Sequence, residues 1–310
     1  MSSDLHTTAT CMFCDRLLRL RDYGVYHPFK RDHGPFDIYV CTACGSCQTE
    51  PLPSRDSLAS LYASYRDGLP NMHRTITEDD PQIALYRLCL DRIILMLGLG
   101  ANDEFTWLDV GAGGGEFSTL MTETFPRSRG VAIDLHPRPM SLAGISAIEW
   151  RQIDISSKEF AASLPQANLV ASISVWEHVL RPDLFIVSLL QLLRPGGMLY
   201  LLCPNNASWA SRLLGRRWPY FTPGEHLAIP TPVGAVRCLE RGWDLIQGAS
   251  ERIIVRARPL MLPYTPRYVF RRLGAEFLGR MLPTGWSLPL PVGALEVVLI
   301  RPAVMVSEGI

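Results

Sequence analysis

Residues 107–115 have the sequence WLDVGAGGG and are followed by EFSTL at 116–120, and this stretch decides the fold. A hydrophobic strand ends in an acid, Asp109, and glycine then occupies alternate positions at Gly111, Gly113 and Gly115 before a helical segment begins. Glycines at a strand-to-helix turn let the backbone approach a ligand that a Cβ would block. The open N-terminus of the helix offers unpaired N–H groups. We therefore expect a nucleotide-like ligand at the end of this strand.

Strand and helix patterns alternate from residue 105 onward. The predicted strands are 105–110, 129–134, 149–153, 169–175, 198–203, a strand that begins at 242–246, and 294–300. The predicted helices are 115–124, 182–193 and 232–241, with an amphipathic helix at 81–97 before them. This alternation predicts a parallel sheet with right-handed crossovers, in which ligands bind beyond the carboxyl ends of the strands.

A proline-rich insertion at about 256–292, with a short Arg-rich helix near 267–282, is expected before the last strand. The insertion either packs against the rest of the domain without a further role, or it covers a site or touches a membrane surface.

Composition indicates a globular protein that is neither basic nor acidic overall. The chain has 310 residues, 47% of them apolar, and 30 basic residues balance 30 acidic ones. Zero net charge gives no general attraction to nucleic acid. We expect no transmembrane helix, because no run of about 18 apolar residues occurs. The polar start, without an apolar segment, predicts a cytoplasmic protein with reduced cysteines.

Four early cysteines form two C-x2-C pairs and predict a structural zinc site. The ligands would be Cys11, Cys14, Cys41 and Cys44, with Cys47 or His33 as a possible replacement for one of them. Two such pairs can supply four thiolates to one tetrahedral ion. A disulfide or a redox pair is the alternative, but a redox motif needs one pair on a βαβ unit. About 50 residues are too few to fold by core burial alone, so the metal would stabilise the ribbon.

The glycine turn departs from the dinucleotide fingerprint G-x-G-x-x-G, because the sixth position counted from Gly111 is Glu116. What remains is an acid on the strand followed by alternating glycines. A ligand that carries a cationic amino-acid group in place of a phosphate fits this pattern better, since Asp109 would then face a positive group.

At this point the chain resembles the class I S-adenosylmethionine-dependent methyltransferases, over about residues 105–248. Residues 108–115 are similar to the family's first motif, Asp134 to the acid that accepts both ribose hydroxyls, and Asp154 to the position beside the adenine amine. Residues 174–179 (SVWEHV), 193–199 (LRPGGML) and 203–205 (CPN) are similar to later segments of the family. Asn168 replaces the usual acid before the fourth strand, and a proline-rich link follows Asp134.

The resemblance implies an α/β fold: a Rossmann-like seven-stranded methyltransferase sheet with a small N-terminal zinc-ribbon domain. It implies a zinc ribbon at 1–50, a helical linker or cofactor lid at 51–104, and a methyltransferase domain at 105–310. It also implies S-adenosylmethionine as cofactor beside structural Zn²⁺. The implied cofactor-binding residues are Asp109, Gly111, Ala112, Gly113, Asp134, Leu135, Asp154, Ile155 and Ser174.

Methyl transfer mainly requires an aligned nucleophile, and a hydroxyl acceptor needs a base near neutral pH. His178, after the fourth strand, and His226, after the fifth, are the candidate catalytic residues. His178 could instead position the cofactor or cap a helix, and His226 could simply pack in its loop. Aromatic residues of the same loop either wall an acceptor site or are buried; they are Trp209, Trp218, Tyr220 and Phe221.

The absence of an Asn/Asp-Pro-Pro-Tyr motif after the fourth strand disfavours methylation of bases and amides. Basic residues do not interleave with aromatics, so no nucleic-acid partner is expected. The N-terminal ribbon together with this core resembles bacterial methyltransferases found with sugar and secondary-metabolite pathways. The resemblance implies a small-molecule acceptor, with a hydroxyl of a sugar or secondary-metabolite intermediate preferred to a carbon atom. An NAD-dependent oxidoreductase and a non-enzymatic zinc-ribbon interaction module are the alternatives. The sequence does not address the oligomeric state.

Overall fold

The computed structural model describes residues 10–20, 36–60, 81–155, 160–218, 220–247, 253–264, 277, 281 and 288–303. Its strands are β1 (Leu18–Leu20), β2 (Asp37–Cys41), β3 (Cys47–Glu50), β4 (Thr106–Val110), β5 (Arg129–Asp134), β6 (Ile148–Gln152), β7 (Ala167–Ile173), β8 (Leu193–Pro204), β9 (Ala228–Ile229), β10 (Ile254–Tyr264) and β11 (Leu288–Ile300). Its α-helices include α2 (Pro81–Leu97), α3 (Glu116–Thr124), α4 (Pro182–Gln191), α5 (Trp209–Leu214) and α6 (Pro232–Gln247). The 3₁₀ turns are η3 (Met140–Leu142), η4 (Phe160–Ser163), η5 (Trp176–His178) and η6 (Gly215–Arg217).

The main sheet has seven strands in the order β10-β11-β8-β7-β4-β5-β6. Strands β4 to β8 pair in parallel, whereas β11 is antiparallel to β8 and β10 is antiparallel to β11. The predicted Rossmann-like α/β fold is therefore confirmed. The chain reverses direction of travel across the sheet at the β7–β4 boundary, and this is where open α/β sheets bind their ligands.

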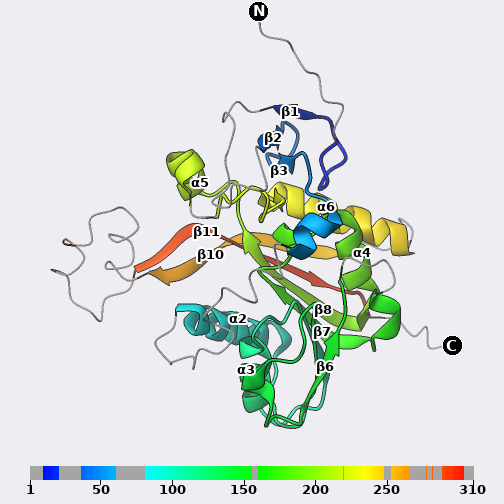
Figure 1. Cartoon of the computed structure of the whole chain (residues 1–310). Coiled ribbons are helices and arrows are strands. Elements are labelled where there is room, and N and C mark those ends of the chain that lie inside the picture. The colour runs from blue at the N-terminus through cyan, green and yellow to red at the C-terminus, as the bar shows by residue number, and fades with distance from the viewer. Residues whose placement is uncertain are drawn as a thin grey trace, which may run out of the picture.

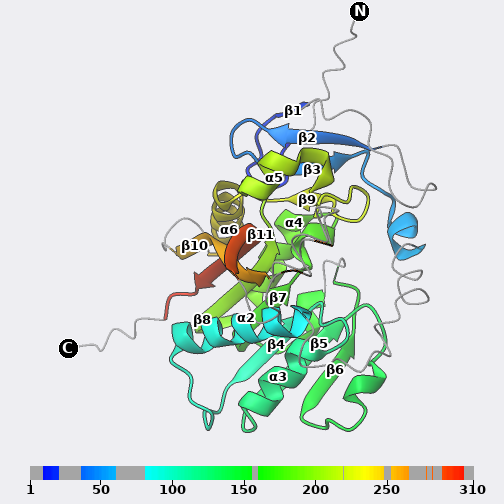
Figure 2. The same ribbon diagram turned by 90° about the vertical axis from the view of Figure 1, so that its left-hand side faces the viewer.

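Alternate side chains of the strands pack on opposite faces of the sheet, as the strand geometry requires. Leu108 and Val110 of β4 share a buried cluster with residues of α4 and α6, whereas Trp107 joins a second cluster with α2 and α3. Helices thus cover both faces, as Figures 1 and 2 show.

The predicted strand at 242–246 is wrong, because these residues lie in the last turns of α6. Cys238, Leu239, Gly242 and Trp243 are buried, and this spacing of three and four residues places them on one helical face. The extra strand of the sheet is β10 instead, which occupies residues that the sequence had assigned to the insertion. Most of the remaining insertion, with the predicted helix near 267–282, lies outside the described residues.

A second sheet contains the early cysteines and has the order β1-β2-β3-β9. Its last strand comes from residues 228–229, so this sheet is completed by a segment that follows the main parallel strands in sequence. In both views the second sheet lies at one end of the molecule, near α5, and α3 lies at the other end (Figures 1 and 2). Within the described residues, no helix combines the length and hydropathy that a membrane crossing requires.

Candidate functional site

The glycine turn after β4 uses backbone angles that favour glycine. Gly111, Gly113 and Gly115 all adopt positive φ angles, at 82°, 56° and 80°, which side chains disfavour. The glycines differ in their surroundings. A Cβ on Gly111 would lie 2.2 Å from Val175 Cγ2, whereas no described atom lies within 4 Å of the position that a Cβ on Gly113 would take. Gly111 is therefore needed for packing, and Gly113 faces open space.

Asp134, at the carboxyl end of β5, holds the turn. The Gly113 N–H donates to Asp134 Oδ2 at 2.8 Å. The His136 N–H donates to Asp134 Oδ1 at 2.9 Å, and His136 Nδ1 lies at the same distance from that oxygen. The carboxylate is thus fixed directly beside the open space at Gly113.

Asp109 lies beneath the turn rather than on its surface. Its side chain is buried, and Ser118 on α3 donates a hydrogen bond to Asp109 Oδ2 at 2.7 Å. Burial raises the pKa of Asp109 to about 7, the hydrogen bond from Ser118 opposes this shift, and the nearby Asp134 adds to it. The carboxyl group therefore ties β4 to α3. The structure gives no described cationic partner for it.

The other predicted cofactor residues lie at the carboxyl ends of neighbouring strands. Leu135 follows β5 and is 39% exposed, and Asp154 and Ile155 follow β6, with Asp154 exposed. Ser174 follows β7; it is exposed and has a φ of 56°, which is uncommon for a residue other than glycine. Ala112 is buried in the turn itself. The four strands β7, β4, β5 and β6 are adjacent, so these residues border one edge of the sheet.

The two candidate bases are close together. The rings of His178, in η5, and His226, in the loop before β9, lie 4.6 Å apart in a T-shaped arrangement. His178 Nδ1 lies 3.0 Å from the carbonyl oxygen of Glu225, and His226 Nδ1 lies 2.6 Å from that of Tyr220. Burial lowers the pKa of both rings, that of His178 to about 3. Both histidines are therefore neutral at physiological pH.

Glu177 is the residue that sequence reasoning missed. It precedes His178, its side chain is buried, and burial raises its pKa to about 8. Among the residues that the structure describes, none donates a hydrogen bond to Glu177 Oε2. Glu177 and His178 are adjacent in the sequence and follow a parallel strand. This acid–histidine pair is the sequence signal that could have marked Glu177 as a candidate site residue.

The aromatic loop packs against the cysteine-containing sheet. Trp218 and Phe221 are buried in one cluster with Ile38 and Cys47. Of the four aromatic residues for which an acceptor wall and burial were the alternatives, these two are buried in the core between the loop and the second sheet, whereas Trp209 is 48% exposed.

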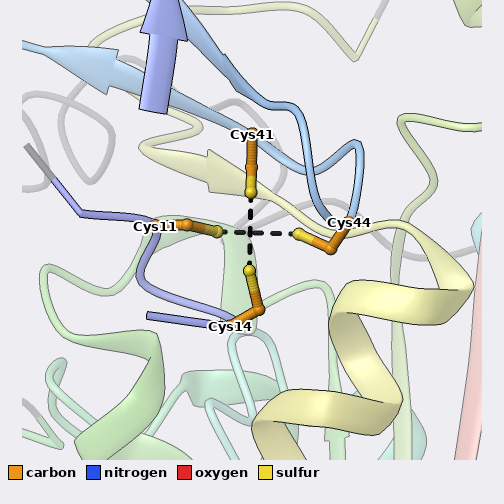
Figure 3. Close-up of side chains that lie close together, drawn as sticks. All are labelled: Cys11, Cys14, Cys41 and Cys44. Carbon is orange, nitrogen blue, oxygen red and sulfur yellow. Dashed lines mark hydrogen bonds between the residues drawn. The ribbon is translucent and has the colours of Figure 1, made fainter. Parts of the chain in front are cut away.

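The four predicted metal ligands converge on one point, as Figure 3 shows. Cys11 Sγ lies 3.6 Å from Cys44 Sγ, and Cys14 Sγ lies 3.4 Å from Cys41 Sγ. These distances exclude disulfides, whose sulfurs are about 2.05 Å apart. They are close to the spacing of about 3.8 Å that follows from tetrahedral Zn–S bonds of about 2.3 Å.

The two cysteine loops have matching backbone hydrogen bonds. Cys11 N donates to the carbonyl of Arg16, and Cys41 N donates to that of Ser46. Asp15 and Gly45, each directly after the second cysteine of its pair, have positive φ angles of 59° and 73° and donate back to the carbonyl of the first cysteine. The hydrogen bond between Cys11 and Cys44 lowers the pKa of Cys44 to about 5 and, together with burial, raises the pKa of Cys11. The fit to a metal ion held by four thiolates rests on the convergence of the four sulfurs.

A family model described as a methyltransferase domain matches residues 82–246, more than half of the chain. The chain belongs to this methyltransferase family. The resemblance noted in the sequence is thus confirmed at the level of the family.

Curated relatives match the chain only in part. A trans-aconitate 2-methyltransferase from Azoarcus sp. (strain BH72) is 28% identical over 147 residues, which are 46% of this chain and 57% of the relative. A ubiquinone biosynthesis O-methyltransferase from Leptothrix cholodnii is 32% identical over 113 residues, 34% of this chain and 47% of the relative. The chain spans about half the length of the curated relatives it matches.

Among solved structures, the plantazolicin methyltransferase BamL, in complex with a triazolic desmethylPZN analog and SAH, is similar with a TM-score of 0.50 and 12% identity. The likeness covers 78% of this chain and 90% of that one. At this identity it shows a shared fold and nothing more.

Proposed function

We propose that the protein transfers the methyl group of S-adenosylmethionine to a hydroxyl group of a small-molecule acceptor. The observation that carries the proposal is the turn at Gly113, which faces open space and is fixed to Asp134 at the ligand-binding edge of the sheet. A carboxylate at that edge suits a pair of ribose hydroxyls. Membership of the methyltransferase family supports this reading over an oxidoreductase.

The proposed cofactor residues contact different parts of S-adenosylmethionine. Gly113 leaves room for the amino-acid end of the cofactor, Asp134 accepts the ribose hydroxyls, and Asp154 lies where the adenine amine is expected. His136, which holds Asp134 Oδ1, would then yield that oxygen to the ribose. Asp109 supports the turn through Ser118 instead of contacting the ligand.

When bound, the cofactor supplies an electrophilic methyl carbon and its own leaving group, so the protein needs to place the acceptor oxygen and remove its proton. His178 and His226 are adjacent, and because Nδ1 of each ring meets a backbone carbonyl, Nε2 is the atom of each ring that can accept a proton. A hydroxyl acceptor is favoured because one of the matched relatives is named as an O-methyltransferase. The acceptor's identity, including the sugar or secondary-metabolite class, is part of the proposal.

We further propose that Cys11, Cys14, Cys41 and Cys44 hold a structural Zn²⁺. Four thiolates complete a tetrahedral shell and leave no position for a substrate. The ion would therefore stabilise the second sheet without taking part in methyl transfer.

Calorimetry with S-adenosylmethionine tests the proposed cofactor. Folded, zinc-loaded protein should bind it with one-to-one stoichiometry, and Asp134→Asn should weaken binding at least about tenfold, because a neutral amide loses charge-assisted hydrogen bonds to the ribose. The same exchange at the exposed Asp244 on α6 is the matched control and should leave affinity unchanged. Absence of binding by the folded wild-type protein, with binding of NADH in its place, would refute the proposal in favour of an oxidoreductase.

A further inference from the structure

Three potential metal ligands lie together at the carboxyl end of β7, about a different centre from the four cysteines. Glu177 and His178 come from η5, and His226 comes from the loop that leads into β9. One ligand atom from each of the three lies within 4.8 Å of the other two. The main chain fixes this arrangement, since Leu227 N donates to the carbonyl of Glu177 at 2.7 Å.

The hydrogen bonds of the two imidazoles define their tautomers. Nδ1 of His178 and Nδ1 of His226 each meet a backbone carbonyl, which can only accept a hydrogen bond. Both Nδ1 atoms therefore carry the proton, and in a neutral ring Nε2 then presents its lone pair. Metal-binding histidines are usually oriented in this way, with the other ring nitrogen donating to a carbonyl or carboxylate.

Glu177 supplies an independent observation. Its side chain is 2% exposed, and Oε2 has no hydrogen-bond donor among the described residues. A buried carboxylate with one oxygen that no donor meets is costly unless a cation compensates it. The one ion-pair candidate described for Glu177 is His178, whose Nε2 lies 4.0 Å from Oε1, and the acidic Glu225 nearby adds negative charge.

We propose that Glu177, His178 and His226 form a second metal site, which binds one divalent transition-metal ion through a glutamate oxygen and two Nε2 atoms. Two imidazoles and one carboxylate favour zinc, iron, manganese or cobalt over calcium or magnesium, which prefer oxygen ligands alone. The three atoms must draw closer together on binding, because ligand atoms about 2.0–2.1 Å from zinc lie roughly 3.3 Å apart.

Three protein ligands leave an open position, and this inference about its use rests on the proposed methyl transfer. An acceptor hydroxyl bound there would lose its proton to water at neutral pH, because the metal lowers the pKa of a bound hydroxyl. The acceptor oxygen then forms a bond to the methyl carbon, and the carbon–sulfur bond breaks with its electron pair left on sulfur. In this scheme the two histidines hold the metal, and the metal takes over the task that a histidine base would perform.

Cobalt titration of the zinc-loaded protein tests the site without measuring activity. After removal of loosely bound metal, mass spectrometry should find one zinc per chain. Added Co²⁺ should then produce visible d–d absorption with a stoichiometry of one, without the thiolate-to-cobalt charge-transfer band of a cysteine site. Glu177→Gln and His226→Gln should each weaken Co²⁺ binding by more than about 100-fold, because loss of an outer-shell partner alone costs about 10–100-fold. Glu123→Gln makes the same exchange as Glu177→Gln at an exposed position of α3 outside both clusters, and this matched control should keep Co²⁺ affinity.

Folding of each variant is checked by its retained zinc and its binding of S-adenosylmethionine. If wild-type protein binds no Co²⁺ beyond the cysteine site, or if the signal survives both Glu177→Gln and His226→Gln, the metal site is refuted, while cofactor binding still upholds methyl transfer. If Co²⁺ binds as expected but S-adenosylmethionine does not, the metal site stands and the proposed function fails.

Discussion

The substitution Gly113→Ala tests whether the open space at the glycine turn holds the cofactor. Gly111→Ala is the comparison, because Gly111 is packed against Val175. Gly113 has a φ of 56°, and its substituted Cβ would meet no described atom within 4 Å. The cost to folding is therefore the left-handed backbone alone, about 1–2 kcal/mol. For a chain of this size that lowers Tm by about 2–8 °C.

The same Cβ would occupy the space assigned to the cofactor. We expect Gly113→Ala to lose more than about tenfold in affinity for S-adenosylmethionine, which corresponds to more than about 1.4 kcal/mol. Gly111→Ala should behave differently. Its Cβ would lie 2.2 Å from Val175 Cγ2, so overpacking of about 1–3 kcal/mol adds to a similar backbone cost.

Thermal unfolding and calorimetry on both variants provide the measurement. Gly113→Ala should be the more stable of the two variants and still bind the cofactor poorly. If folded Gly113→Ala binds S-adenosylmethionine within twofold of wild type, the open space at Gly113 is not the cofactor site and the reasoning fails.

Three further predictions concern the metal, a buried acid and a buried ion pair. Cys41→Ser should lower the zinc content below one per chain and reduce solubility; a stoichiometric zinc measurement that does not change would contradict the four-cysteine assignment. Asp109 has a folded pKa raised to about 7 from its usual 3.8, so the folded state binds the proton more tightly and stability falls as pH rises from about 4 to 7. Asp109→Asn should therefore flatten that part of the stability–pH curve, and urea unfolding at pH 5 and pH 8 would show whether it does. Glu296 is buried and accepts hydrogen bonds from Arg92 and Arg258, so Glu296→Ala should cost about 2–4 kcal/mol, moderated by the half-exposed Arg258; an unchanged urea midpoint would show that the pair contributes nothing.

The sequence predicts best those features that the backbone encodes locally. The turn after β4 could be predicted because several glycines follow directly after an apolar strand, and three of them have positive φ angles. The cysteine loops could be predicted because two fixed spacings define four ligands. The strand proposed at 242–246 failed because the short apolar run there fits either secondary structure. Burial of Cys238 and Trp243 against α4 and the sheet favours the helix. A short stretch of sequence does not reveal that packing.

Other features could not be predicted from the sequence because they depend on contacts between distant segments. Nothing in the local sequence indicates that residues 228–229 add a strand to the cysteine sheet, or that a loop histidine meets the His178 ring. The sequence placed Asp109 at the ligand because an acid ends the strand there. Its hydrogen-bond partner Ser118, in the first turn of α3, became evident only in three dimensions.

The cysteine sheet is joined to the candidate catalytic residues by a short series of contacts. Thr49 in β3 donates from its hydroxyl to the carbonyl of His226 at 3.2 Å and from its N–H to the carbonyl of Leu227 at 2.8 Å. Leu227 N then donates to the carbonyl of Glu177. On the other side, Phe13 packs edge-on against Trp176, the residue before Glu177, with ring centroids 5.4 Å apart.

These contacts indicate how the cysteine-containing sheet, the predicted zinc ribbon, relates to the candidate site. A module that only recruits a partner needs no fixed relation to the histidines. Here, however, Trp176 contacts Phe13 from the first cysteine loop, and Glu177 is bonded to Leu227, which is itself bonded to β3. Loss of the structural zinc should therefore disturb Glu177 and His226 before it disturbs the turn at Gly113, which is supported by β5 and α3. The ribbon is thus in direct contact with the segment that carries Glu177 and His226, a relation that a separate interaction module would not require.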